Sequence, residues 1–360
     1  MSMTALFLAV AMTPAGGMNV KVEADGLNGT FAIDPPNRIE VKGERHPCLP
    51  PKTKTPFWAK ECRFKAAYNP QFLAAWAVDP DSVAIFADGR KVSAASWGAR
   101  RQEILDIFQK GMYGKMPPPP EQIVTEVLEE GISQAGFGIR RQIRMWFRED
   151  KSGPHIDWNI LLPRRADGPV PAVMLLNRPG QFSPDNPAGM LLARGYALVT
   201  ACYSDVSADP TDPADEQLAY TGVFDLWGER DPGASDNTAS LAAWGWALMR
   251  GRDMLEHIPE IDTSRVLLTG CGRLGKAALL AGAFDDRFPV VVLNQTGGGG
   301  APLAKHDYGE NVATMTAMFP HWYCKAYAQY ADNEAALPFD QHMILGAIAL
   351  CVPAFSQDDA

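Results

Sequence analysis

Short apolar runs alternate with amphipathic segments across residues 120–293, and this alternation limits the folds that the chain can adopt. Residues 172–176 and 196–202 are continuous apolar runs, which are typical of strands buried on both faces of a sheet. Residues 239–257 have the spacing of a long amphipathic helix, and residues 266–269 form a buried strand that runs into another helix. Further strands are predicted over residues 123–127, 139–147, 155–162 and 290–293, and a further helix over residues 97–112. The pattern predicts a three-layer α/β domain around a mostly parallel sheet.

The N-terminal part of the chain has a different character. Residues 18–65 are rich in Pro, Gly and charge, which predicts an extended arm rather than a core element. Residues 1–17 contain a short apolar run followed by small residues, which resembles the end of a secretory signal, although no Lys or Arg precedes the run. We therefore expect a signal-like segment at 1–17, an arm at 18–65 and an α/β domain at 66–360.

Composition and charge exclude several classes of partner. The 360 residues include 42 acidic and 33 basic side chains, and this acidic balance disfavours nucleic acid or an anionic membrane, since both need a basic face. No apolar run approaches the roughly 18 residues of a membrane-spanning helix. The six cysteines lie far apart without a C-x-x-C pair, so we expect no zinc knuckle, no other metal site and no cofactor.

The segment TGCGRLGK at residues 269–276 joins a buried strand directly to a helix. The nucleophile elbow of α/β hydrolases has this form: small residues flank a Ser whose Oγ stands above the sheet, and the next backbone N–H helps to form the oxyanion hole. Here the tip is Gly272, which has no side chain and cannot attack a carbonyl. Cys271 precedes the tip and is expected to point away from the site. Two other interpretations remain open, a plain βα turn and a phosphate cradle formed with the glycines at 297–300, although neither the Walker nor the Rossmann spacing is present.

Four motifs follow one another in order along the chain: GCGRLGK at 270–276, AGAFDDRF at 281–288, NQTGGGGA at 294–301 and LPFDQH at 337–342. With these motifs, residues 97–350 resemble the glucuronoyl esterase family, carbohydrate esterases that cleave esters between lignin alcohols and glucuronic acid on xylan. The resemblance implies a three-layer αβα sandwich of α/β-hydrolase type. It implies as partner a glucuronic acid-bearing xylan or a lignin–carbohydrate ester, and an extracellular or periplasmic location, since lignocellulose cannot enter the cytoplasm.

Carried over position by position, the resemblance implies that the catalytic triad is lost. Gly272 stands at the nucleophile position, and Gln295 stands 23 positions later at the acid position, where an amide cannot stabilise an imidazolium as a carboxylate does. The family's His follows the last strand, whose start is expected at residues 351–355. Because the sequence ends at Ala360, we expect a C-terminally incomplete domain without that His. His342 lies in a different motif and is expected to be structural.

The same comparison implies that the binding residues are retained. Arg273 follows the tip, and its counterpart in the family helps to stabilise the oxyanion. Lys276 lies four residues after Gly272 and so projects from the same helix face; its counterpart binds the uronic acid sugar. Glu310 and Trp322 resemble residues that hydrogen-bond to the sugar and pack against it, although a solvated Glu and a core Trp are the plainer interpretations.

Loss of a whole triad lowers turnover by about a million-fold and leaves roughly 10³- to 10⁴-fold catalysis over water from oxyanion donors and binding. The expected function is therefore an ester hydrolase scaffold that acts on or binds glucuronic acid esters with impaired catalysis. The alternatives are a sugar-binding pseudoenzyme and a non-functional, truncated family member.

Overall fold

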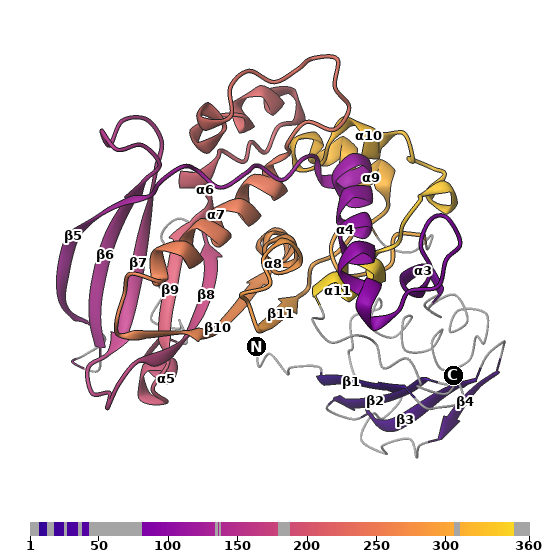
Figure 1. Ribbon diagram of the computed structural model, residues 1–360, viewed down its shortest axis with the longest axis horizontal. Coiled ribbons are helices and arrows are strands. Elements are labelled where there is room, and N and C mark those ends of the chain that lie inside the picture. The colour runs from indigo at the N-terminus through magenta and orange to yellow at the C-terminus, as the bar shows by residue number, and fades with distance from the viewer. Residues whose placement is uncertain are drawn as a thin grey trace, which may run out of the picture. The chain divides into compact units, whose positions relative to one another are not determined.

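The computed structural model describes residues 81–133, 136, 138–178, 188–305 and 310–348, and the backbone of four strands nearer the N-terminus. The chain divides into two compact units, residues 1–81 with 351–360, and residues 82–350 (Figure 1). Each unit is described by itself.

The first unit contains a four-stranded antiparallel sheet in the order β1-β2-β3-β4. Its strands are β1 (Phe7–Met12), β2 (Met18–Ala24), β3 (Leu27–Asp34) and β4 (Arg38–Lys42). Three of them lie where the sequence predicts an extended arm, because alternating apolar and polar residues in segments such as MNVKVEA favour a strand more strongly than the Pro and Gly content disfavours it. Residues 43–65 lie outside the described residues, and the signal-like interpretation of residues 1–17 stays a prediction.

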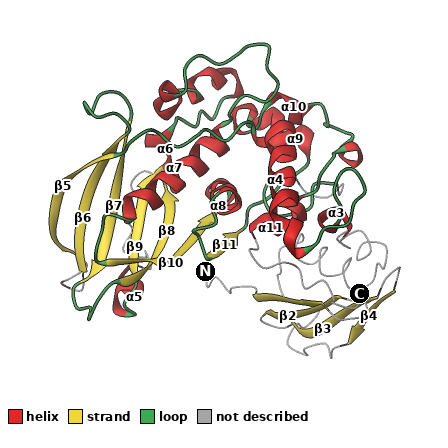
Figure 2. Cartoon of the chain, viewed as in Figure 1, coloured by secondary structure: helices red, strands yellow, loops and turns green. Residues whose placement is uncertain are grey.

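The second unit is built on a seven-stranded sheet in the order β11-β10-β8-β9-β7-β6-β5 (Figure 2). Its strands are β5 (Val124–Ser133), β6 (Gly138–Trp146), β7 (His155–Pro163), β8 (Val170–Asn177), β9 (Ala197–Cys202), β10 (Ile261–Cys271) and β11 (Val290–Asn294). The predicted strands are all present, but the expectation of a mostly parallel sheet is wrong. The strands β8 to β11 pair in parallel. The pairs β5–β6 and β6–β7 are antiparallel because short connections join them as hairpins, and β7 also pairs antiparallel with β9.

Helices cover both faces of the parallel half, as expected of a three-layer sandwich. The longer helices are α4 (Trp97–Phe108), α7 (Ser240–Leu255), α8 (Arg273–Phe284) and α11 (Gln341–Ile348). The shorter ones are α3 (Asp81–Ala84), α5 (Ala188–Ala193), α6 (Tyr203–Val206), α9 (Val312–Met318) and α10 (Lys325–Ala328). Helices α7 and α8 pack on β8 and β10, while α5 packs on β7 and β9 in a separate apolar cluster.

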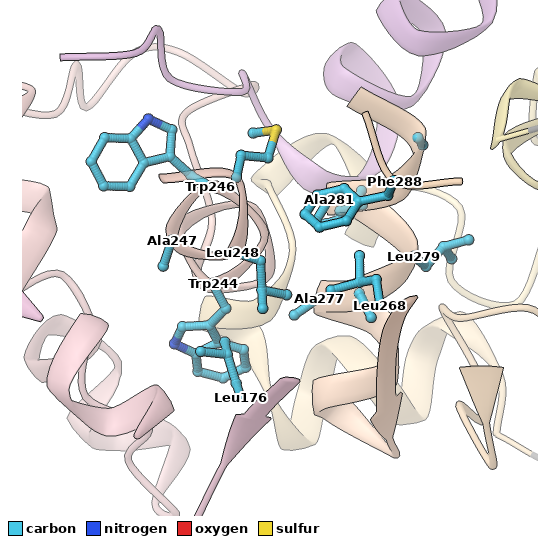
Figure 3. Close-up of a cluster of buried hydrophobic side chains, with 14 of the residues drawn as sticks. Leu176, Trp244, Trp246, Ala247, Leu248, Leu268, Ala277, Leu279, Ala281 and Phe288 are labelled. Atoms are coloured by element: carbon cyan, nitrogen blue, oxygen red, sulfur yellow. The ribbon is translucent and has the colours of Figure 1, made fainter. Parts of the chain in front are cut away.

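The main core lies between α7, α8 and the sheet. Figure 3 shows Leu248 of α7 facing Ala277 of α8 and Leu268 of β10, and Trp244 of α7 beside Leu176 of β8. The two helices approach closely because α7 has a glycine at the crossing: a Cβ on Gly245 would lie 3.1 Å from the Cβ of Leu280. Among the described residues, no helix is both long enough and apolar enough to span a bilayer.

The parallel strands set the position of the site. From β8 the chain moves to one side through α5 and β9, and then crosses to the other side through α7 and β10. In open α/β sheets such a switch point leaves space at the carboxyl ends of the strands, where ligands bind. The β10–α8 turn, the residues after β11 and the residues after β9 all lie at these carboxyl ends.

Candidate functional site

The β10–α8 turn has the backbone geometry of an elbow. Gly272 adopts φ 60° and ψ −127° and precedes the first residue of α8. Its N–H donates a 3.0 Å hydrogen bond to the carbonyl oxygen of Asn294 on the neighbouring strand. A Cβ built on Gly272 would meet nothing within 4 Å, so the tip has room for a side chain but carries none.

Gln295 lies beside the tip, because β10 and β11 are parallel neighbours and Cys271 pairs with Asn294. The residue is exposed and has a positive φ of 47°. Cys271 is also exposed, and its Sγ lies 4.0 Å from Oε1 of Gln295. The Cys271 thiol therefore lies at the same sheet edge as Gln295, the residue at the acid position. The sequence analysis instead predicts that this thiol points away from the site. Among the described cysteines, Cys202, Cys271 and Cys324 are free, and Cys48, Cys62 and Cys351 lie outside the described residues.

Two cations of α8 lie against one indole ring. The guanidinium carbon of Arg273 is 4.7 Å from the ring centroid of Trp322, and Nζ of Lys276 is 5.0 Å from it. The ring of Phe319 stacks on the same indole at a centroid distance of 3.9 Å. Cation–π attraction holds both basic groups against this ring. Both residues lie in the first turn of α8, directly after Gly272. The geometry thus brings together Arg273, Lys276 and Trp322, which the sequence predicts as site residues.

The ammonium of Lys276 is in an unusual position for a charged group. The residue is only 3% exposed, and its ammonium has no hydrogen bond or ion pair with any residue of the described part of the chain. Burial lowers the pKa of Lys276 to about 8, against the opposing effect of the negative charge of Glu310. A buried, unpaired ammonium of this kind is a donor available to a ligand.

Asp209 is a charged residue of the candidate site that the sequence does not reveal. Its side chain is 3% exposed and forms an ion pair with Arg273. Its Oδ1 also accepts a 2.9 Å hydrogen bond from Nε1 of Trp322 and lies 2.8 Å from Nε2 of His321. Since a carboxylate can only accept, Nε2 carries the proton. Burial alone would raise the pKa of Asp209, but these hydrogen bonds and the charge of Arg273 lower it to about 2.

The position of Asp209 explains why no motif identifies it. It follows α6, seven residues after the end of β9, in a segment without a recognisable pattern. The one available signal is that it comes shortly after the carboxyl end of a buried strand, where site residues gather in open sheets.

The glycine run at 297–300 has a packing role around Glu310. The N–H of Gly298 donates a 2.7 Å hydrogen bond to Oε2 of Glu310. Gly297 has φ 63°, and a Cβ there would lie 2.4 Å from the same oxygen. The carboxylate of Glu310 already accepts the hydrogen bond of the Gly298 N–H, which argues against a phosphate-binding role for this loop. Glu310 is thereby tied to the loop by a hydrogen bond, while the residue itself is exposed to solvent.

Trp322 is 3% exposed, so most of its ring already packs against Phe319, Arg273 and Lys276. This is the arrangement of a core Trp, and a direct contact with a sugar stays a prediction. His342 lies on α11, which packs against α4 and α8. Among the described residues, no group of His, Cys, Asp and Glu is arranged to hold a metal ion.

The arrangement offers hydrogen-bond donors to a ligand but no attacking group at the tip. Arg273 and Lys276 supply donors for the oxygens of a polar ligand, and the amino end of α8 supplies a partial positive charge. The tip that would carry a nucleophile carries a hydrogen atom. An acyl transfer through residue 272 would therefore lack its attacking group.

Sequence comparisons give a consistent result. A family profile described as "Glucuronyl esterase, fungi" matches residues 148–352. The carbohydrate esterase MZ0003 from an unknown prokaryotic organism is 31% identical over 319 residues, which cover 76% of this chain and 70% of the relative. A 4-O-methyl-glucuronoyl methylesterase of Podospora anserina is 27% identical over 73% of this chain and 52% of its own length. The chain thus spans about half of that fungal relative.

Among solved structures, a glucuronoyl esterase from Solibacter usitatus superposes with a TM-score of 0.68 at 31% identity. The match covers 76% of this chain and 78% of the other. A promiscuous CE15 esterase from a marine bacterial metagenome gives a TM-score of 0.66 at 28% identity, over 75% of this chain. These likenesses confirm the predicted α/β-hydrolase type of fold.

Proposed function

Because this chain belongs to the glucuronoyl esterase family, we propose that it binds glucuronic acid esters at the β10–α8 turn and hydrolyses them poorly. The observation that carries the proposal is that the tip of the β10–α8 turn has no side chain, while two basic side chains lie close to it. Gly272 offers no nucleophile, whereas Arg273 and Lys276 are both held against Trp322 within one helical turn.

The binding half of the proposal rests on Lys276. Among the described residues, the ammonium of Lys276 contacts only the ring face of Trp322, and the hydroxyl or carbonyl oxygens of a sugar ester would add the hydrogen bonds that it lacks there. Glu310, fixed by Gly298, is a ready acceptor for a sugar hydroxyl near the same charge. Relatives named methylesterases of 4-O-methyl-glucuronoyl esters suggest the class of ligand, glucuronic acid esters of glucuronoxylan or of lignin–carbohydrate complexes.

The catalytic half of the proposal rests on Gly272 and Gln295. Without a hydroxyl at the tip, hydrolysis depends on a water held by the oxyanion donors, which accounts for only a small part of an esterase's rate. Gln295 lies beside the tip and cannot take up charge. We also propose an extracellular or periplasmic location, where polymeric xylan is present.

Isothermal titration calorimetry of the purified chain with methyl glucuronate tests both halves. We expect a saturable binding heat without the steady heat of turnover. Lys276→Met should weaken binding at least tenfold, whereas Lys151→Met, which removes a lysine paired with Glu126 on another part of the surface, should leave it unchanged. A steady heat at the rate of an active esterase would refute impaired catalysis. A flat trace at millimolar ligand would refute binding and favour a non-functional family member.

A further inference from the structure

The two basic side chains next to Gly272, Arg273 and Lys276, differ in whether an anionic side chain pairs with them. Of the two cations of α8, Arg273 has a full anionic partner in Asp209, while Lys276 has none within ion-pair distance in the described part of the chain. Glu310 acts on Lys276 only through its field, and its Oε2 is engaged by Gly298. The hydroxyl of Tyr203 lies in the field of both Asp209 and Arg273.

Asp209 is also fixed in place by its other contacts. His321 and Trp322 both donate to it, and its side chain is almost fully buried. A competing anion that took the Nη1 group of Arg273 from this carboxylate would leave a buried charge with fewer partners, which is strongly unfavourable. The guanidinium of Arg273 therefore has its charge satisfied before any ligand arrives.

An uncharged ligand does not compete with Asp209 for Arg273 as an anion does. A guanidinium has five N–H donors, and the ion pair engages the Nη1 group of Arg273. Its remaining donors are not engaged by Asp209, and an ester carbonyl that accepts from them brings no charge to repel that carboxylate. A free uronate carboxylate has the same sign of charge as Asp209 and meets its repulsion.

From this geometry we propose that Asp209 is a specificity-determining residue, which makes the site favour the uncharged uronic acid ester over the free uronate anion. Asp209 acts through Arg273 rather than by touching the ligand. The inference rests on the proposed function, because it concerns the ligand class of the same site. If the inference holds, the uronic acid that ester cleavage releases is a poor ligand of the site.

The test is the ratio of two dissociation constants, for methyl glucuronate and for glucuronate, measured by calorimetry at pH 7, where a free carboxylic acid is ionised. We expect the chain to bind the ester more tightly than the acid. Asp209→Asn keeps the size of the side chain and removes its charge, and it should shift the ratio toward the acid about tenfold. The control Asp157→Asn breaks the ion pair with Arg144 between β6 and β7 and should leave the ratio unchanged.

A double substitution identifies the cation. If Arg273 captures the carboxylate once Asp209 is neutral, Asp209→Asn combined with Arg273→Gln should lose the gain in acid affinity. A merely structural role of Asp209 would weaken both ligands alike and leave the ratio unchanged, which would overturn the inference. Preference of the unsubstituted chain for the acid would overturn it too, without any variant having to fold. Binding of neither ligand to the unsubstituted chain would overturn the proposed function and this inference with it.

Discussion

Gly272→Ser restores the hydroxyl at the tip and tests the physical reason why a glycine is tolerated there. The backbone at φ 60° and ψ −127° is accessible to Gly and strained for any residue with a Cβ. The space in front of the tip is open, since a Cβ would meet nothing within 4 Å. Backbone strain, rather than a steric clash, is therefore the main cost of the substitution, and we expect it to lower the free energy of unfolding by about 1–2 kcal/mol.

Thermal unfolding followed by circular dichroism measures this change. For a domain of this size about 1 kcal/mol corresponds to a shift of about 2–4 °C, so the melting temperature should fall by about 2–8 °C. Two other glycines with equally open surroundings provide controls. Gly89 has φ 85°, and Gly89→Ser should show a similar loss. Gly98 lies in α4 without a positive φ, and Gly98→Ser should be neutral or slightly stabilising, because a helix favours Ser over Gly.

An unchanged or raised melting temperature for Gly272→Ser would refute the strain argument, provided that Gly89→Ser falls as expected. Hydrolysis of methyl glucuronate by the same variant is a separate readout. We expect no recovery of turnover, because Gln295 still occupies the acid position and offers no charge to a catalytic base. Recovery of full esterase activity would refute that part of the reasoning and leave the strain argument standing.

Three further predictions concern the charges and the glycine loop. Lys276→Met should raise the free energy of unfolding at pH 7 by on the order of 1–3 kcal/mol. The stability of the unsubstituted chain, relative to this variant, should rise between pH 8 and 10.5 in urea titrations, because in that window the unfolded chain holds a proton that folded Lys276 has released. The carboxyl of Asp209 has its pKa lowered from 3.8 to about 2, so it stabilises the fold above pH 4; about 2 kcal/mol of stability should be lost as the pH falls from 4 toward 2, and this loss should be absent in Asp209→Asn. Gly297→Ala should lower the melting temperature more than Gly89→Ala, because the new Cβ would lie 2.4 Å from Oε2 of Glu310 in addition to the backbone strain.

The fold is largely predictable because its parallel half is encoded locally. Buried strands such as β9 are continuous apolar runs, and α7 is a long, largely apolar segment that is buried on nearly all sides rather than amphipathic as predicted. The strands of the antiparallel half are predicted but their direction is not, because strand direction depends on the connections, and the turns between β5, β6 and β7 carry no strong signature. The strands of the N-terminal unit are hidden by the Pro and Gly that punctuate them.

The site is predictable only where a motif runs along one element. Gly272, Arg273 and Lys276 are fixed by a strand and a helix in immediate succession, so their relative positions follow from helix geometry. Asp209 reaches Arg273 from 64 residues earlier in the chain, and His321 lies 48 residues after Arg273. Such contacts depend on the tertiary fold, and a single sequence has no local pattern that encodes them.

The residue at the tip and the charged network beside it are separable in this architecture. Arg273 is held by Asp209, Phe319 and Trp322, and none of these contacts involves a side chain at position 272. A glycine at the tip relaxes the turn and leaves the charged network unchanged. Lys276 argues further for a ligand, because an apolar side chain of similar length would fill its place without the penalty of a buried ammonium. In the described part of the chain this charge meets only the ring face of Trp322, whereas the oxygens of a bound sugar ester would give it hydrogen bonds.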